Sequence, residues 1–247
     1  MEEYNLLGVK INCVSEQLAK ELLISCLNSD SQHQIATVNP EFIVEAQTNE
    51  KFKQVLNNVS FSTIDSAGVV FALQFYGHKV SLSDRLTGVR LTEIILDLAS
   101  KRNYKILFCL HPQGFTSAEK FFIIIKNKYP ELDFQVCTPE EARLKADTFQ
   151  PEILLAGLGA PLQELWIDEH LTQMPSVKVA VGVGGALDFI AGTKTRAPKF
   201  MRSFGLEWLW RLILQPNRIK RIYRAIVVFL YLIIIRHSPE RTNKLKK

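Results

Sequence analysis

The segment Glu152-Ile-Leu-Leu-Ala156-Gly-Leu-Gly159-Ala-Pro-Leu-Gln163-Glu164 decides the fold, because its apolar run leads through a glycine-rich turn into a polar stretch. The run Glu152–Ala156 is continuously apolar after its first residue, as is typical of a strand buried on both faces of a sheet. The glycines permit a tight turn, and Gln163 falls in the first turn of the expected helix, where it can face a ligand. A strand, a turn and a helix in this order form the repeating unit of parallel α/β sheets.

Similar apolar, β-branched runs alternate with helical stretches along the chain. The strands that we expect are Leu7–Val14, Gln34–Val38, Phe61–Ile64, Lys105–Leu110, Asp133–Cys137, Glu152–Ala156 and Lys178–Val183. The helices that we expect run from the N-cap Ser15 to about Asn28, from Pro40 onward, and over Arg90–Arg102, Thr116–Tyr129, Leu162–Met174 and Ala186–Ala191. The alternation predicts an α/β fold with a mainly parallel, Rossmann-like sheet flanked by helices.

The composition is that of an ordinary globular protein, with 247 residues, of which 47% are hydrophobic and 22% charged. The four cysteines form no CxxC pair, so we expect neither a disulfide framework nor a metal site, and a reducing cytosol fits. The five histidines are isolated and no Asp-x-Asp motif occurs. We therefore expect no metal and no cofactor.

Positive charge gathers at the C-terminal end. From Arg196 onward, 52 residues hold 13 Lys or Arg and two acidic residues, a net charge of +11. The whole chain carries +5, so residues 1–195 carry −6. We place a boundary there, between an α/β body of residues 1–195 and a basic, helical appendage of residues 196–247.

The sequence of the appendage predicts an amphipathic helix that starts near Pro216. Basic and apolar residues fall on opposite faces of this helix, with Arg218, Arg221 and Arg224 on one face and Ile219, Ile222 and Ile226 on the other. The run Ile226–Ile235 is too short to cross a bilayer, which needs about 20 residues. We expect a helix lying on an anionic membrane surface. One alternative is that the helix packs on the body or in an oligomer interface. Another is that it binds nucleic acid, but the apolar run would then have no role.

Polar residues follow two of the expected strands, where α/β sheets bind ligands. Thr37 and Asn39 share a strand face and can hydrogen-bond a sugar, or they can serve a turn and an N-cap. Asp65 can act as a general base toward a substrate hydroxyl. The spacing alone favours an N-cap at Asp65.

Glycine turns and an arginine offer sites for phosphate groups. The turn Gly182-Val-Gly184-Gly185-Ala-Leu-Asp188 suits close approach of backbone N–H groups to a phosphate, but Leu187 breaks the dinucleotide fingerprint. An NAD-dependent oxidoreductase is therefore a weak alternative. Arg85 can clamp a diphosphate, or form a surface ion pair with Asp84.

These motifs, in this order, resemble the WecG/TagA/CpsF family of bacterial glycosyltransferases over nearly the whole chain. The matching pieces are Thr37-x-Asn39-x-Glu41, Asp65 with Gly68, Arg85-x-Thr87-Gly88, Gly157-x-Gly159-x-Pro161-x-Gln163-Glu164-x-Trp166, Gly182-x-Gly184-Gly185-x-x-Asp188, Arg196-Ala-Pro198, Gly205-Leu-Glu207-Trp208-x-x-Arg211 and Pro216-x-Arg218-x-x-Arg221.

The resemblance implies an inverting, metal-independent transfer of N-acetylmannosamine, or a related hexosamine, from its UDP donor. The acceptor would be N-acetylglucosamine linked by diphosphate to a polyprenol, in teichoic-acid-type surface polysaccharide synthesis. The enzyme would lie on the cytoplasmic face of the cell membrane, and self-association stays open. Other UDP-sugars, such as glucose or N-acetylmannosaminuronate, are alternatives, and a non-catalytic membrane scaffold is a remote one.

The resemblance also implies roles for single residues. Asp65 would be the catalytic base, and the substrates would be bound by Thr37, Asn39, Arg85, Gln163, Gly184, Gly185 and Asp188. Appendage arginines would complete the site, namely Arg211, Arg218, Arg221 and Arg224.

Three departures from the family pattern bear on the choice of donor. Arg90 stands where the family commonly has an acid, and Asp65-Ser-Ala-Gly68 replaces Asp-Gly-x-Gly. The segment Cys109–Gly114 is more polar than the family's.

Overall fold

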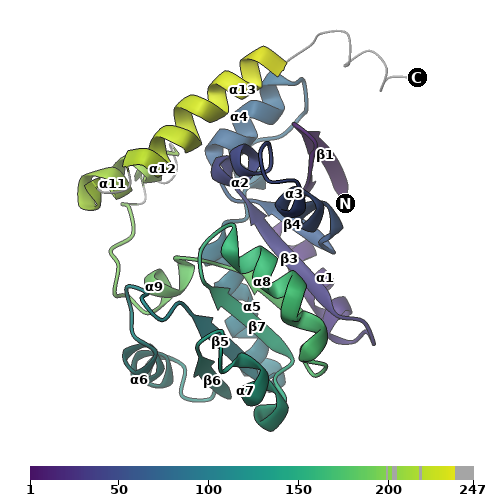
Figure 1. Cartoon of the computed structure of the whole chain (residues 1–247), viewed down its shortest axis with the longest axis vertical. Helices are drawn as coiled ribbons and strands as arrows, with labels where there is room; N and C mark the ends of the chain where they lie inside the picture. Colours follow the sequence, from purple (N-terminus) through teal and green to yellow (C-terminus); the bar gives the residue numbers. More distant parts are fainter. Residues whose placement is uncertain (199, 202–204, 217–218, 237–247) are drawn as a thin grey trace.

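The computed structural model describes residues 1–198, 200–201, 205–216 and 219–236. Within these residues, six parallel strands form one sheet in the order β4-β3-β8-β7-β5-β6 (Figure 1). The strands are β3 (His33–Val38), β4 (Phe61–Ile64), β5 (Ile106–Leu110), β6 (Phe134–Cys137), β7 (Ile153–Gly157) and β8 (Val179–Gly182). The predicted α/β class and the positions of these six strands are confirmed.

Helices cover both faces of the sheet because its strands are apolar on both sides. They are α1 (Glu16–Leu27), α2 (Pro40–Glu45), α3 (Glu50–Asn58), α4 (Ala67–Phe75), α5 (Gly88–Arg102), α6 (Ala118–Lys128), α7 (Ala142–Phe149), α8 (Leu162–His170) and α9 (Ala186–Ile190). One core cluster joins one face of the sheet to α1, α5, α6 and α9, and another packs α7 and α8 against strands β5, β7 and β8.

The predicted helices exist, with two differences. The helix expected over Leu162–Met174 ends at His170 and continues as a 3₁₀ turn, Leu171–Gln173. Met174, the last residue of the predicted helix, precedes Pro175, and the α conformation is disfavoured for a residue before proline. Helices α3, α4 and α7 were not predicted.

The strand predicted over Leu7–Val14 is wrong at its start. Strand β1 (Glu2–Leu6) turns at Leu7 and Gly8, both with positive φ, into the antiparallel strand β2 (Val9–Cys13). A two-residue turn of this kind matches the twist of a hairpin. The hairpin is fastened to β4, because Asn12 N donates to Ser62 Oγ at 3.2 Å and Ser62 N donates to Asn12 Oδ1 at 2.9 Å.

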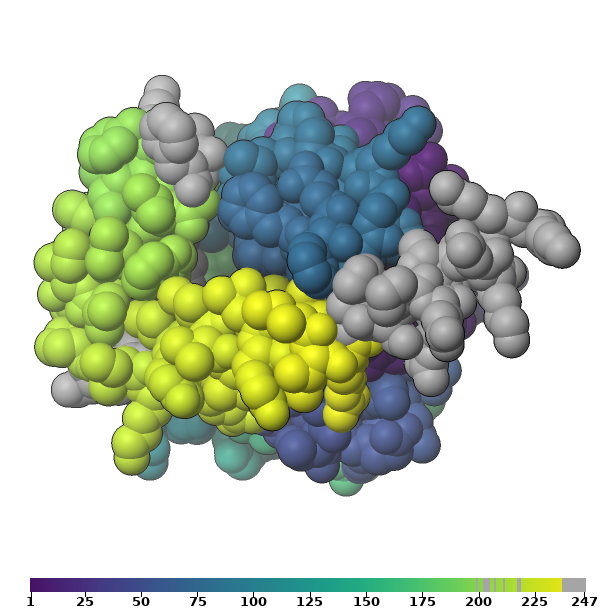
Figure 2. Space-filling view, turned by 90° about the horizontal axis from the view of Figure 1, so that it is seen from above, coloured from purple at the N-terminus to yellow at the C-terminus, as the bar shows by residue number. Residues whose placement is uncertain are grey.

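The C-terminal helices lie across α2 and α4, on the half of the molecule that holds the N-terminal hairpin (Figures 1 and 2). They are α11 (Glu207–Leu214), α12 (Ile219–Tyr223), a π-helical turn over Arg224–Val228, and α13 (Phe229–Arg236). Phe229 and Ile233 are 1% and 3% exposed and pack into the core cluster that includes α2, α3 and α4. In the described part of the chain, no helix has the length and apolar character that crossing a membrane requires.

Candidate active site

Thr37, Asp65 and the start of α5 come together at the carboxyl edge of the sheet. Thr37, at the end of β3, is 4% exposed, and its Oγ1 donates to the Gly182 carbonyl at 3.5 Å. A Cβ atom on Gly88 would lie 3.4 Å from Thr37 Oγ1 and 3.6 Å from Asp65 Oδ2. A hydroxyl, a carboxylate and a helix N-terminus thus share one small region, made from three separate segments of the chain.

Asp65 is not the N-cap of the helix that follows it. Ser66 has that role, because its side chain accepts from Val69 N at 3.2 Å. The backbone N–H of Asp65 donates to Val38 O at 2.9 Å, which extends the pairing of β3 and β4 past their ends. The N-cap interpretation of Asp65 is therefore wrong, and its carboxylate lies beside the N-terminal turn of α5, whose dipole favours negative charge.

Asn39 does serve as an N-cap. Its Oδ1 accepts from Glu41 N at 2.9 Å and from Phe42 N at 3.3 Å at the start of α2. A ligand contact would come from its Nδ2 group, so its predicted role in substrate binding stays a prediction.

The segment that holds Arg85 lies along the end of β4, since Leu86 N donates to Ile64 O at 3.0 Å. Arg85 Nε donates to Leu82 O at 3.1 Å. The carboxylate of Asp84 accepts from Ser81 N at 2.7 Å and from Ser81 Oγ at 3.0 Å. The segment places Arg85 three residues before Gly88, and diphosphate binding by Arg85 stays a prediction.

Gln163 lies between two glycine turns. It is 2% exposed, and its Oε1 accepts from Gly159 N at 3.0 Å. A Cβ atom on Gly184, whose φ is +49°, would lie 3.4 Å from the same Oε1. Gly185 is exposed, and its Cβ position meets no described atom within 4 Å. The amide of Gln163 therefore organises the turns, and its direct contact with substrate stays a prediction.

A pocket of about 320 Å³ opens at the carboxyl ends of β5, β6 and β7. It is lined by His111, Pro112, Gln113, Pro139, Glu140, Leu158, Leu162 and Trp166. Trp166 stacks on His170, with ring centroids 5.2 Å apart. This pocket was not predicted from the sequence, although Trp166 belongs to a matching motif and His111 and Gln113 belong to the unusually polar segment after β5.

Asp188 makes contacts within the protein. Thr116 Oγ1 donates to its Oδ1 at 2.7 Å, and Lys194 pairs with its Oδ2. Lys194 Nζ also lies 4.6 Å from the centre of the Phe115 ring. Asp188 thus ties the loop after β5 to the segment after α9, and its predicted substrate contact stays a prediction.

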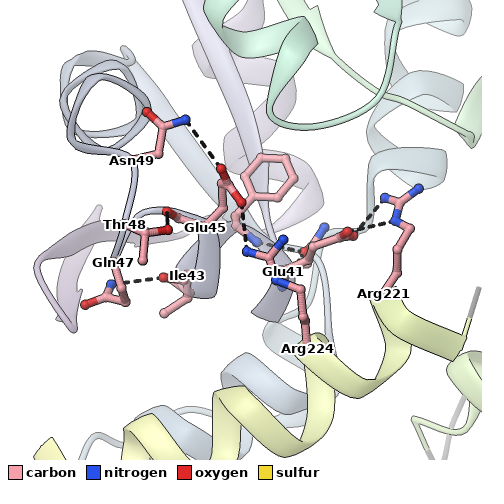
Figure 3. A network of polar contacts seen from close by, with 10 residues as sticks. Glu41, Ile43, Glu45, Gln47, Thr48, Asn49, Arg221 and Arg224 are labelled. Carbon is pink, nitrogen blue, oxygen red and sulfur yellow. Dashed lines mark hydrogen bonds and ion pairs between the residues drawn. The ribbon is translucent and has the colours of Figure 1, made fainter.

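Two predicted appendage arginines dock on α2 (Figure 3). Arg221 pairs with Glu41, and Arg224 NH2 lies 2.8 Å from Glu45 Oε2. The side chain of Arg211 and the whole of Arg218 lie outside the described residues. The amphipathic pattern is present, but Arg221 and Arg224 face the body, whereas Ile219 and Tyr223 are exposed. The predicted roles of these two arginines, in completing the site and on the membrane-facing appendage, stay predictions.

The departure at Arg90 lies outside this site. Its guanidinium, on the exposed side of α5, pairs with Glu16 of α1 at 2.7 Å and with Glu93 at 3.1 Å. Among the described residues, no three His, Cys, Asp or Glu side chains gather as a potential metal site.

A model of the "Glycosyl transferase WecG/TagA/CpsF family" matches residues 4–243. The chain belongs to this family. It is 31% identical over 203 residues to the N-acetylglucosaminyldiphosphoundecaprenol N-acetyl-beta-D-mannosaminyltransferase of Staphylococcus aureus strain MRSA252, covering 80% of this chain and 78% of the relative. The protein of the same name from strain NCTC 8325 / PS 47 is 30% identical with the same coverage. This WecG/TagA/CpsF member is thus a glycosyltransferase, and the resemblance seen in its motifs is confirmed.

Proposed function

We propose that this glycosyltransferase transfers N-acetylmannosamine from UDP to the N-acetylglucosamine of a polyprenyl-diphosphate-linked acceptor. The names of its relatives support the acceptor and the sugar. The observation that carries the proposal is the meeting of Thr37, Asp65 and Gly88 beside the Gly182 turn. A carboxylate there can take the proton from a hydroxyl group of the acceptor sugar, and the glycine turn can bind a phosphate.

The reaction is a single displacement. The acceptor oxygen attacks the anomeric carbon as Asp65 takes the hydroxyl proton, and the bond from that carbon to the β-phosphate oxygen breaks. UDP leaves with the electron pair, and the anomeric centre inverts. The backbone N–H of Gly185 and the guanidinium of Arg85 stabilise the charge that develops on the diphosphate, whereas the N–H of Gly184 donates to Ala156 O at 3.2 Å and shapes the turn. Since these groups supply the acid–base and electrostatic work, we expect the reaction to proceed without metal.

The strand order supports a donor and an acceptor bound side by side. Asp65 follows β4, Thr37 ends β3, the phosphate turn follows β8, and the pocket lies beyond β7. The pocket combines apolar walls with polar edges, which suits a nucleobase. The uracil would occupy the pocket next to Trp166, with the diphosphate at the Gly184 turn and the sugar directed toward Asp65.

The appendage serves attachment to the cytoplasmic face of the membrane, where the lipid acceptor is. Its outward face is apolar, with Ile219, Tyr223, Val227, Leu230, Tyr231, Ile234 and Ile235 each between 48% and 64% exposed. Phe71 and Phe75, one helical turn apart on α4, are each 52% exposed, on a helix that lies beside α13 in Figure 1. Figure 2 shows the appendage helices and the neighbouring body region on one face of the molecule. Exposed apolar side chains on one helix, with basic residues beside them, suit a membrane interface.

The test is a transfer assay with UDP-N-acetylmannosamine and a short-chain N-acetylglucosaminyl-diphosphate-lipid, run with EDTA and followed by mass. Asp65→Asn keeps the size of the side chain and removes its basicity, so we expect product formation to fall by about 10²-fold or more. Asp97→Asn is the matched control, because Asp97 pairs with Lys101 on the exposed face of α5. Equal rates for Asp65→Asn and wild type would overturn the assignment of the base. UDP-glucose and UDP-N-acetylmannosaminuronate test the other donors.

A further inference from the structure

Glu164 is a carboxyl group buried in the fold for which the proposed reaction has no use. It lies in the first turn of α8 and is 0% exposed. Its Oε1 accepts from Gln163 Nε2 at 2.6 Å, and its Oε2 has no hydrogen-bond partner among the described residues. A carboxylate in this setting would be a buried charge with one oxygen unsatisfied, which costs far more free energy than burial of the protonated acid.

Its surroundings fix it in place. Gln34 Nε2 donates to the backbone carbonyl of Glu164 at 3.0 Å, which ties α8 to β3. A Cβ atom on Gly182 would collide with Glu164 Oε1 and would lie 2.7 Å from Gln163 Nε2. The Gln163–Glu164 pair therefore fits only because residue 182, at the end of β8, is a glycine.

The contact with Glu164 settles how the amide of Gln163 is turned. The amide nitrogen donates to Glu164 and the amide oxygen accepts from Gly159 N, so both ends are held. The oxygen also lies beside Gly184, in the turn that we assign to the diphosphate. We infer that Glu164 is a positioning residue that acts as an uncharged acid and, through Gln163, holds the two glycine turns in the geometry that binds the donor diphosphate. This rests on the proposed function of the Gly184 turn.

The protonation state agrees with this geometry. Burial raises the pKa of Glu164 to about 8, and hydrogen bonds from Gln163 and its own backbone oppose the rise. Helix α8 packs against α3, β3, β7 and β8. The ionisable groups on these elements and on α8 itself do not contribute to the shift; they are Glu50, Lys51, Lys53, His33, Asp168, Glu169 and His170. Glu164 is thus mainly neutral at pH 7 and loses its proton at moderately alkaline pH, where the buried carboxylate would be a poorly solvated charge and we expect the packing around it to change.

The experiment compares wild type with Glu164→Gln, which keeps an acceptor for Gln163 and has no proton to lose, and with Glu164→Leu, which removes the acceptor. Glu169→Gln, an exposed change on the same helix, is the matched control. UDP affinity is measured by calorimetry from pH 6.5 to 9.5, together with KM and kcat for the donor. We expect wild type and Glu169→Gln to lose UDP affinity above pH 8, and Glu164→Gln to keep it. For Glu164→Leu, we expect KM for the donor to rise about tenfold or more with a smaller change in kcat.

Hydrogen exchange of the Gly159 segment needs no substrate, so it separates this inference from the proposed function. At each pH, faster exchange in Glu164→Leu than in Glu164→Gln supports positioning, and equal exchange overturns it. An alkaline loss of UDP affinity in Glu164→Gln as large as in wild type overturns the role of an uncharged acid. If Glu164→Leu does not fold, the comparison of Glu164→Gln with wild type still decides. Turnover that is absent with every donor, while these exchange differences persist, counts against the proposed function alone.

Discussion

The guanidinium of Arg221 meets the carboxylate of Glu41 at two points, with Nε 2.7 Å from Oε1 and NH2 2.8 Å from Oε2. This pair joins the appendage to the first turn of α2, two residues after Asn39 at the edge of the candidate active site. Together with the Arg224–Glu45 pair and the buried side chains of Phe229 and Ile233, it fastens the appendage to the body.

We expect this pair to matter more for the placement of the appendage than for global stability. Because about half of the Arg221 side chain is exposed, Arg221→Ala should cost about 1 kcal/mol or less in the free energy of unfolding. Limited proteolysis within residues 192–206 should become faster, and turnover should fall. The exchange Glu41→Arg with Arg221→Glu should restore slow proteolysis. Unchanged proteolysis in the single variant would show that other contacts hold the appendage.

The apolar surface makes a prediction about membrane binding. Since Arg221 and Arg224 pair with glutamates of the body, membrane attachment should depend on the insertion of apolar side chains into the lipid as well as on charge. Phe71→Ser with Phe75→Ser, and separately Tyr231→Ser with Ile234→Ser, should each reduce sedimentation with phosphatidylglycerol vesicles several-fold. The control is Phe122→Ser with Ile123→Ser on α6, which changes exposed apolar residues elsewhere, at 44% and 60% exposure. If the control and the test pairs lost binding to the same extent, this surface would not be the one that contacts lipid.

Gly88 tests whether the space between Thr37 and Asp65 is used by a substrate. A Cβ atom there stays at van der Waals distance from both side chains, and the position opens a helix, so Gly88→Ala should leave the melting temperature nearly unchanged. Turnover should fall at least tenfold if the acceptor hydroxyl sits in this space. Wild-type kinetics in a folded Gly88→Ala protein would place the acceptor elsewhere.

Glu164 predicts how stability depends on pH. Its pKa is about 8 in the folded protein and near 4.5 when unfolded, so the folded state holds the proton more tightly. Stability contributed by this proton is present below pH 4.5 and is lost progressively until about pH 8, where the loss levels off. Glu164→Gln lacks this loss, and its stability relative to wild type should improve by a few kcal/mol between pH 5 and pH 8.5. Urea unfolding at both pH values measures the change, and a constant difference would mean that Glu164 is ionised in the folded protein throughout.

Much of the architecture could be predicted because its signals are local. Each buried strand is a short apolar run, and Ser15 caps α1 as its side chain and position indicate. The hairpin was missed because one apolar stretch spans the turn, and only the positive φ of Leu7 and Gly8 breaks it. Helix α4 was missed because its residues are apolar almost all round, without a helical period.

The candidate site could be predicted only in part. Asp65 and Thr37 were found as polar residues at strand ends, but spacing alone assigned the N-cap to Asp65, whereas Ser66 provides it. The pocket beside Trp166 collects side chains from the ends of three strands, and no single motif contains them. The uncharged acid at Glu164 has no sequence signal, because a glutamate in the first turn of a helix is ordinarily a solvated one.

Local periodicity, charge and the order of motifs were enough to predict the alternation of strands and helices, the acidic body, the basic appendage and the family. The tertiary structure decided which groups meet. It brings Thr37, Asp65 and Gly88 together, turns Arg221 toward Glu41, and buries Glu164 beneath the glycine turns. The physical reason is that burial and pairing are set by the packing of segments distant in the chain, and a residue's chemistry follows the neighbours that this packing gives it.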